Sequence, residues 1–153
     1  MKRQRRREGD IHRIDLGDGT HVYAREGKFS VSAFYDARVT EELPIDEIVK
    51  LPILFHLSVM DVAIKQGRWK IVGNRSLDEA PLPDPPPQFI QDAIHKKHFR
   101  ITFRNGTIRN ATREEIEGLE RCAIWFPEHV EGRLLDHYEG RTNWVVEGLK
   151  LRD

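Results

Sequence analysis

A run of prolines interrupts the chain close to its middle. Residues 81–87 contain five of the eight prolines in the sequence. Proline lacks a backbone N–H and fixes φ at about −65°, so this segment can be neither a helix nor an interior strand. It predicts an extended connector within one domain, since a chain of 153 residues suits a single domain. A polyproline ligand for another domain would have the same composition.

The residues before the connector predict mainly strands. Apolar and polar residues alternate over 10–16, and Gly17-Asp18-Gly19 then supplies the positive-φ positions of a tight turn. Alternation resumes over 21–25 and 29–35, which predicts a three-stranded antiparallel meander. The apolar segment 51–60 predicts a central strand. Short helical turns are expected at 44–49 and 61–66, followed by an extended segment at 68–73.

The residues after the connector predict further strands and then helices. Segments 88–95 and 98–104 suggest that the sheet continues past the prolines, with Asn105-Gly106 as a hairpin turn into 107–110. Thr112 and Glu115 form a capping box, and a second helix runs from Pro127 to Gly140. We therefore predict a strand-dominated α+β fold, either an antiparallel rolled sheet or a small β-barrel, with two C-terminal helices.

Charge is distributed unevenly although the chain is neutral as a whole. Residues 1–7 hold five basic side chains and no acid, which predicts a basic disordered arm over 1–9 ahead of a single domain at 10–153. Residues 111–140 hold eight acids and three arginines. An arm of this kind could bind phosphate backbones together with basic strands, and the alternative function is therefore a small β-barrel that binds nucleic acid. Its candidate residues are Arg3, Arg5, Arg6, Arg7, Lys96 and Lys97.

Composition and motifs exclude several function classes. One cysteine cannot form an internal disulfide, which favours the reducing cytoplasm, and no apolar segment reaches the roughly 20 residues of a membrane helix. No phosphate-binding, nucleophile-elbow or zinc-protease motif occurs. His95 and His98 flank two lysines and so predict no metal site. We expect no cofactor and no enzyme activity, and rank last a hydrolase built on His129, Asp136 and His137.

Aromatic residues among the C-terminal acids fit a protein interface. Tryptophan and tyrosine anchor interfaces, and carboxylates attract a basic partner. The competing interpretation places these aromatics in the core. The predicted partner-binding residues are Glu114, Glu117, Glu120, Trp125, Glu128, Glu131, Asp136 and Tyr138.

Several short motifs, taken together in their order, resemble the immunity protein 26 family of bacterial polymorphic toxin systems. They are Gly9-Asp10-Ile11, Gly17-Asp18-Gly19, Tyr23-Ala24, Ala33-Phe34-Tyr35-Asp36 and Gly67-Arg68-Trp69 with Gly73. The resemblance covers nearly the whole chain, with residues 111–138 as an extension. It implies a mostly β cytoplasmic immunity protein that binds and occludes a cognate protein toxin. A nuclease with a basic cleft is one toxin that the acidic segment would attract. The family has no catalytic motif to transfer.

Overall fold

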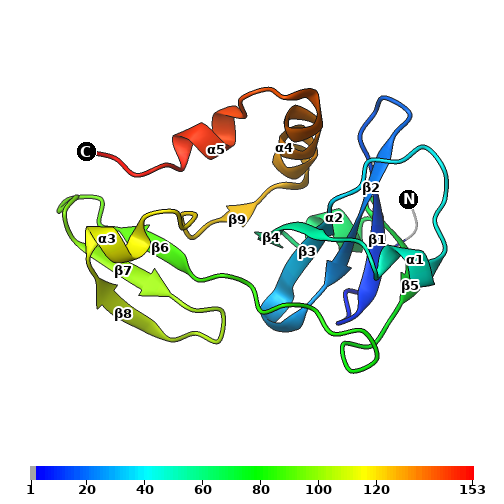
Figure 1. Cartoon of the computed structure of the whole chain (residues 1–153), viewed down its shortest axis with the longest axis horizontal. Helices are drawn as coiled ribbons and strands as arrows, with labels where there is room; N and C mark the ends of the chain where they lie inside the picture. Colours follow the sequence, from blue (N-terminus) through cyan, green and yellow to red (C-terminus); the bar gives the residue numbers. More distant parts are fainter. Residues whose placement is uncertain (1–2) are drawn as a thin grey trace.

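The computed structural model describes residues 3–153, which form nine strands in two sheets and five short to medium helices (Figure 1). The larger sheet has the strand order β5-β1-β2-β3-β4-β9. Its neighbours pair antiparallel except for β4 and β9, which pair parallel. The bounds are β1 Asp10–Asp15, β2 His21–Glu26, β3 Val31–Tyr35, β4 Ile53–Val59, β5 Lys70–Asn74 and β9 Ile124–Trp125.

Local turn chemistry sets up this sheet as the sequence predicts. β1 and β2 form a hairpin in which Asp15 pairs with His21, and Gly17 and Gly19 in its turn have φ values of +84° and +87°. β3 completes the meander. β4 is an interior strand because β9, which the sequence did not predict, adds to its far edge. The sheet is open, with β5 and β9 at its two edges.

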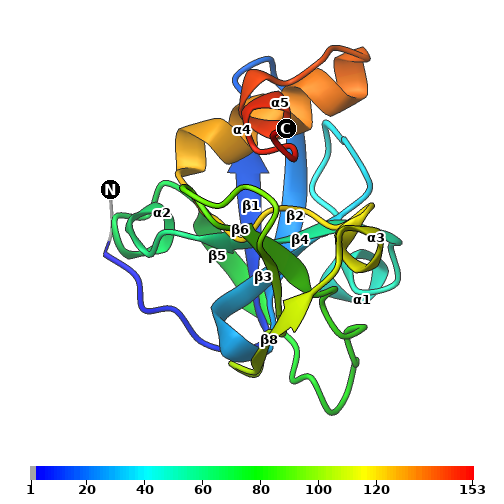
Figure 2. The same cartoon turned by 90° about the vertical axis from the view of Figure 1, so that its left-hand side faces the viewer.

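Both faces of the large sheet are covered. On one face, Val130 and Leu134 of α4 (Pro127–Glu139) join Phe34 and Trp69 in the main core cluster. On the other face, Ile48 of α1 (Ile45–Ile48) joins Tyr23 and Tyr35. α2 (Val62–Lys65) contributes Ala63 to the main cluster. Figure 2 shows α4 and α5 (Trp144–Gly148) together on one side of the strands.

The connector separates the large sheet from a second, smaller sheet. β6 (Gln88–Gln91), β7 (Phe99–Thr102) and β8 (Ile108–Ala111) pair antiparallel and make a second lobe with α3 (Arg113–Ile116) (Figure 1). The sequence predicted instead that one sheet continues past the prolines. Prolines cannot donate ladder hydrogen bonds, so pairing stops before residue 81 and begins anew at Gln88.

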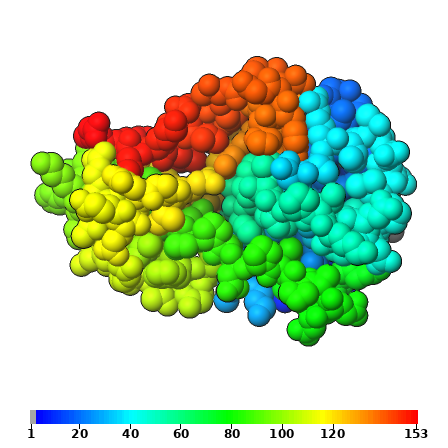
Figure 3. Space-filling model, viewed as in Figure 1, coloured from blue at the N-terminus to red at the C-terminus, as the bar shows by residue number. Residues whose placement is uncertain are grey.

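The C-terminal residues join the two lobes. The space-filling view shows the orange and red residues running along the upper edge from one lobe to the other (Figure 3). Leu151 packs on the small core of Phe89, Phe99 and Ile116. The capping box of α3 and the Pro127 start of α4 are confirmed. α5 is a further helix that the sequence did not predict, and the Asn143 side chain caps its first turn.

Candidate partner-binding surface

The apolar residues in β9 and directly after it fall into a buried set and an exposed set. Side chains on a strand point alternately to opposite faces. Trp125 therefore faces the main core and is only 3% exposed, whereas Ile124 and Phe126 are 69% and 48% exposed. The sequence predicted Trp125 as a partner-binding residue. Its burial means that it supports the surface from below and cannot itself touch a partner.

Three aromatic rings form a continuous row at the start of α4 and α5, in which the two outer rings are exposed and the central His129 is partly buried. The His129 ring lies edge-on between Phe126 and Trp144, with centroid distances of 5.5 Å and 5.2 Å. Trp144 is 72% exposed. We call Phe126, His129 and Trp144 the aromatic row. The sequence did not predict this row, because large aromatic residues such as Trp144 more often pack in cores. The place of Trp144 at the first position of α5, directly after the Asn143 cap, is the signal that could have found it.

Two of the predicted acidic residues, Glu120 and Glu131, are occupied by contacts within the protein. Glu120 forms an ion pair with Arg133 at 2.8 Å, and the same guanidinium stacks on Phe55 at 4.1 Å. Glu131 accepts two hydrogen bonds from Arg68. The carboxylate of Glu131 also accepts one from the Trp69 indole at 2.9 Å. These acids fasten the C-terminal elements to the large sheet, so their charges are largely neutralised.

Asp136 and Tyr138 also have structural partners. Asp136 accepts hydrogen bonds from Asn143 and Arg141, which lower the pKa of its carboxyl group. The Tyr138 hydroxyl donates to Asp36 at 2.9 Å. Burial and this carboxylate together raise the pKa of Tyr138. Both side chains therefore position α4 and the chain around Asn143.

Glu114, Glu117 and Glu128 are exposed and form no ion pair within residues 3–153. Glu114 and Glu117 lie in and just after α3, on the small lobe. Glu128 lies in the first turn of α4, beside the aromatic row. The eight predicted residues are therefore not one acidic patch. Glu128 is the free carboxylate that accompanies the exposed aromatic rings.

The basic residues of the nucleic-acid alternative lie at opposite ends of the long axis. Residues 3–7 run beside the large sheet, whereas Lys96 and Lys97 lie in the turn between β6 and β7, next to the C-terminus (Figure 1). The described part of the predicted disordered arm is anchored, because Gln4 donates to the carbonyls of Ile64 and Trp69. Residues 1 and 2 lie outside the described residues.

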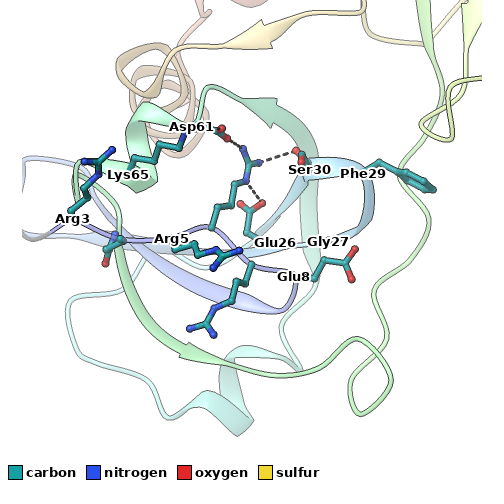
Figure 4. Close-up of a pocket in the computed structure, with 12 residues that line it drawn as sticks. Arg3, Arg5, Glu8, Glu26, Gly27, Phe29, Ser30, Asp61 and Lys65 are labelled. Carbon is teal, nitrogen blue, oxygen red and sulfur yellow. Dashed lines mark hydrogen bonds and ion pairs between the residues drawn. The ribbon is translucent and has the colours of Figure 1, made fainter.

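Arg6 is turned into the protein, although the sequence grouped it with the arginines that would bind phosphate. Its Nε donates to Glu26 at 2.6 Å and its Nη1 to Asp61 at 2.7 Å (Figure 4). Burial opposes the charged form, but these two carboxylates outweigh it and raise the pKa of Arg6. A guanidinium held by two carboxylates has little capacity left for a phosphate.

The histidines named in the sequence analysis do not form a cluster with acids. His129 lies in the aromatic row, and the His137 ring meets the Tyr138 ring edge-on, with a centroid distance of 4.9 Å. Within residues 3–153, no group of three or more His, Cys, Asp or Glu side chains is arranged to hold a metal ion. None of the helices in the same residues has both the length and the hydropathy of a membrane span.

A comparison with known protein families shows which family the chain belongs to. The sequence profile described as Immunity protein 26 matches residues 7–100. The chain belongs to the immunity protein 26 family. No curated protein and no solved structure matches the chain significantly. The matched range ends inside β7, so it is shorter than the resemblance predicted from the sequence, which covers nearly the whole chain.

The residues that carry the immunity protein 26 resemblance build the large sheet. Gly9 has φ +81°, and a Cβ atom there would overlap the Arg75 carbonyl. Gly73 faces Ile45 so closely that a Cβ atom would displace that side chain. Phe34 and Tyr35 are buried on the two faces of the sheet. These matching residues have structural roles, whereas the aromatic row lies beyond residue 100.

Proposed function

We propose that this protein is a bacterial immunity protein that neutralises a cognate toxin by binding and occluding it, without catalysis. Family membership indicates an immunity protein in general. The observation that carries the binding mode is the aromatic row, with Trp144 72% exposed and Phe126 48% exposed beside the unpaired Glu128. Exposed aromatic clusters of this kind supply the anchors of protein interfaces.

The aromatic row lies in the part of the chain that the family profile does not match. Members of a family that bind different partners need a shared scaffold and a variable contact surface. The large sheet supplies the scaffold here, and β9, α4 and α5 supply the contact surface. A basic partner fits this surface, because Glu128 is free to attract cations and the rings can exclude water around such a contact. A nuclease with a basic cleft is the toxin class we favour, and the cytoplasm is the location at which such a toxin would have to be stopped.

The test is co-expression with the product of the neighbouring toxin gene, followed by titration calorimetry. We expect a tight one-to-one complex that abolishes toxin activity. Trp144→Ala and Phe126→Ala should each weaken binding at least tenfold, since truncation of an interface anchor costs about 2 kcal/mol or more. Ile124→Ala should weaken binding, and Ile94→Ala provides the matched control because Ile94 is 85% exposed at the opposite lobe.

Charge reversal must spare the acids that hold the fold together. Glu128→Lys changes a carboxylate without an ion pair in the described residues, whereas Glu131 and Asp136 are held by internal contacts. We expect Glu128→Lys to slow association with a basic toxin and to lower the melting temperature only slightly, since Glu128 lies in the first turn of α4. Full inhibition by the Trp144→Ala, Phe126→Ala and Glu128→Lys variants would overturn this surface as the toxin contact.

A further inference from the structure

The turn between β2 and β3 holds an exposed phenylalanine in a conformation that disfavours it. Phe29 and Ser30 have φ values of +60° and +58°, and Val31 N–H closes the turn on the Lys28 carbonyl. Two-residue turns with positive φ at both positions prefer Asn-Gly, and a bulky residue there is an outlier. Phe29 is nevertheless 58% exposed. Strained residues of this kind concentrate at functional sites, so the ring is a candidate contact.

A row of arginines leads toward this ring. In residues 3–7, Gln4 and Arg6 point inward and are held by hydrogen bonds, whereas Arg3, Arg5 and Arg7 are exposed and form no ion pair within residues 3–153. The three arginines line a hollow of about 580 Å³ that also contains Phe29 and Lys65 (Figure 4). Extended chains rise about 3.3 Å per residue, so alternate positions lie roughly 7 Å apart. An extended partner with acids at alternate positions has the same spacing.

Phe29 also lines a second, smaller hollow, which we call the slot. Its volume is about 140 Å³, and an apolar cavity of roughly 150 Å³ can hold benzene. The volume of the slot is therefore close to that needed for one aromatic ring. Gly27 and Phe29 belong to both the hollow and the slot, so the two are neighbours. The slot is also lined by the apolar residues Val31, Leu77, Pro81, Leu82, Pro83 and Pro85, and by the charged or polar side chains of Lys28, His56, Asp78 and Asp84.

We propose that Arg3, Arg5, Arg7 and Phe29 form a docking surface for an extended acidic segment of a partner protein that carries one aromatic side chain. The carboxylates pair with the arginine row, and the aromatic ring enters the slot against Phe29. Anchoring by Gln4 and Arg6 holds the row in place before binding, which reduces the entropy lost on association. This surface is separate from the aromatic row and does not depend on toxin binding.

The charge distribution favours a short acidic segment over nucleic acid. A nucleic-acid strand carries one charge about every 3.4 Å and needs a long track of cations. The hollow offers Arg3, Arg5, Arg7 and Lys65, but its lining also includes Glu8, Glu26 and Asp61. Lys96 and Lys97 of the nucleic-acid alternative lie at the far end of the molecule (Figure 1). A long polyanion would therefore meet Glu8 within the hollow, and Lys96 and Lys97 could not extend its basic track.

The test uses fluorescein-labelled ten-residue peptides and fluorescence anisotropy with the full chain. Two test peptides each carry three glutamates at alternate positions and a single tyrosine, which stands at the N-terminal end in one and at the C-terminal end in the other. Control peptides replace the glutamates by glutamine or the tyrosine by serine. We expect one of the two test peptides to bind saturably, with an affinity that falls severalfold as the salt concentration rises. Both control peptides should bind at least tenfold more weakly. Equal binding of all peptides would overturn the proposal.

Variants locate the peptide on the surface. Phe29→Gly removes the ring and keeps the turn, because glycine adopts positive φ without strain. This variant and the triple variant Arg3→Gln, Arg5→Gln, Arg7→Gln should each lose at least tenfold in affinity. The matched control, Lys96→Gln with Lys97→Gln, should retain full affinity. Unchanged peptide binding by Phe29→Gly, tighter binding of a thymidine oligonucleotide than of the peptide, or self-association through this surface in sedimentation would each overturn the assignment.

Discussion

At the scale of single residues, Glu26 holds a buried polar cluster within the large sheet. It is 2% exposed and contacts Arg6 at 2.6 Å, His12 at 3.3 Å and the Ser32 hydroxyl. Burial alone would raise the pKa of Glu26, but the neighbouring His12 ring and the Arg6 charge lower it below its ordinary value of 4.5. Glu26→Gln should cost about 3 kcal/mol of unfolding free energy at neutral pH, because Arg6 loses its buried partner.

The same residue predicts a pH dependence. Since the folded-state pKa is lowered, the unfolded chain takes up the proton first, and the stability from Glu26 is present above its unfolded pKa of 4.5. It is lost as the pH falls through the folded value. Urea titrations at decreasing pH should therefore show that the difference in unfolding free energy between wild type and Glu26→Gln shrinks below about pH 4.5. Glu8→Gln, a change at an exposed acid nearby, should show no such gap, and a constant gap at all pH values would contradict the role of Glu26.

Phe29 allows a second prediction at this scale, in which removing a side chain stabilises the fold. A non-glycine residue at positive φ costs on the order of 1 kcal/mol or more, and the exposed ring returns little of it by packing. Phe29→Gly should raise the unfolding free energy by up to about 1 kcal/mol. Lys28→Gly, one residue earlier at a position without positive φ, should lower it by about 0.5–1 kcal/mol. A loss of stability in both variants would show that the turn is unstrained.

At the scale of elements, α4 is fastened to the turn before β5 by one carboxylate. Glu131 accepts three hydrogen bonds, from Arg68 and Trp69. Glu131→Ala should cost about 2 kcal/mol, since it removes charge-assisted hydrogen bonds and leaves the Trp69 indole N–H without a partner. Glu128→Ala, one helical turn earlier and exposed, should have little effect. Thermal unfolding followed by tryptophan fluorescence compares the two, and equal losses would contradict the fastening role of Glu131.

Elements whose signals are local were predictable from the sequence, and those that depend on distant pairing were not. Gly17-Asp18-Gly19, Asn105-Gly106 and the capping box at Thr112 act within a few residues, and the structure has the turns and helix start that they predict. The parallel pairing of β9 with β4 joins residues more than sixty positions apart. Likewise, the arginines at 3, 5 and 7 are exposed because Gln4 and Arg6 find partners in other elements. Composition alone predicted one uniform arm.

The free charge of the acidic surface could not be predicted from the sequence either. The sequence places Glu128, Glu131 and Asp136 on one helix with equal charges. Arg68, from the turn before β5, occupies Glu131, and Arg141, just past the end of the same helix, occupies Asp136. Of these three acids only Glu128 therefore remains without an ion pair in the described residues. A sequence pattern gives the charge of a helix face, but the tertiary partners decide how much of that charge a binding partner meets.

At the scale of the whole molecule, the boundary of the family match is not a structural boundary. Residue 100 lies within β7, and the large sheet is completed from beyond it by β9 and α4. Trp125, Val130 and Leu134 are nearly or fully buried in the main core. Full burial of such side chains contributes about 1.5–3 kcal/mol each, so losing all three would remove about 4.5–9 kcal/mol, an amount comparable with the whole stability of many small domains.

A chain that ends at residue 100 should therefore fail to fold, although it contains the whole family match. It would also expose the edge of β4, which invites aggregation. A chain that ends at residue 142 keeps β9 and α4 and should retain the fold with reduced stability, because α5 contributes only partly buried residues. Amide NMR spectra distinguish the outcomes. A dispersed spectrum from the shorter chain would make the large sheet an independent unit, whereas cooperative unfolding of both sheets in the full chain would support a single domain over residues 10–153.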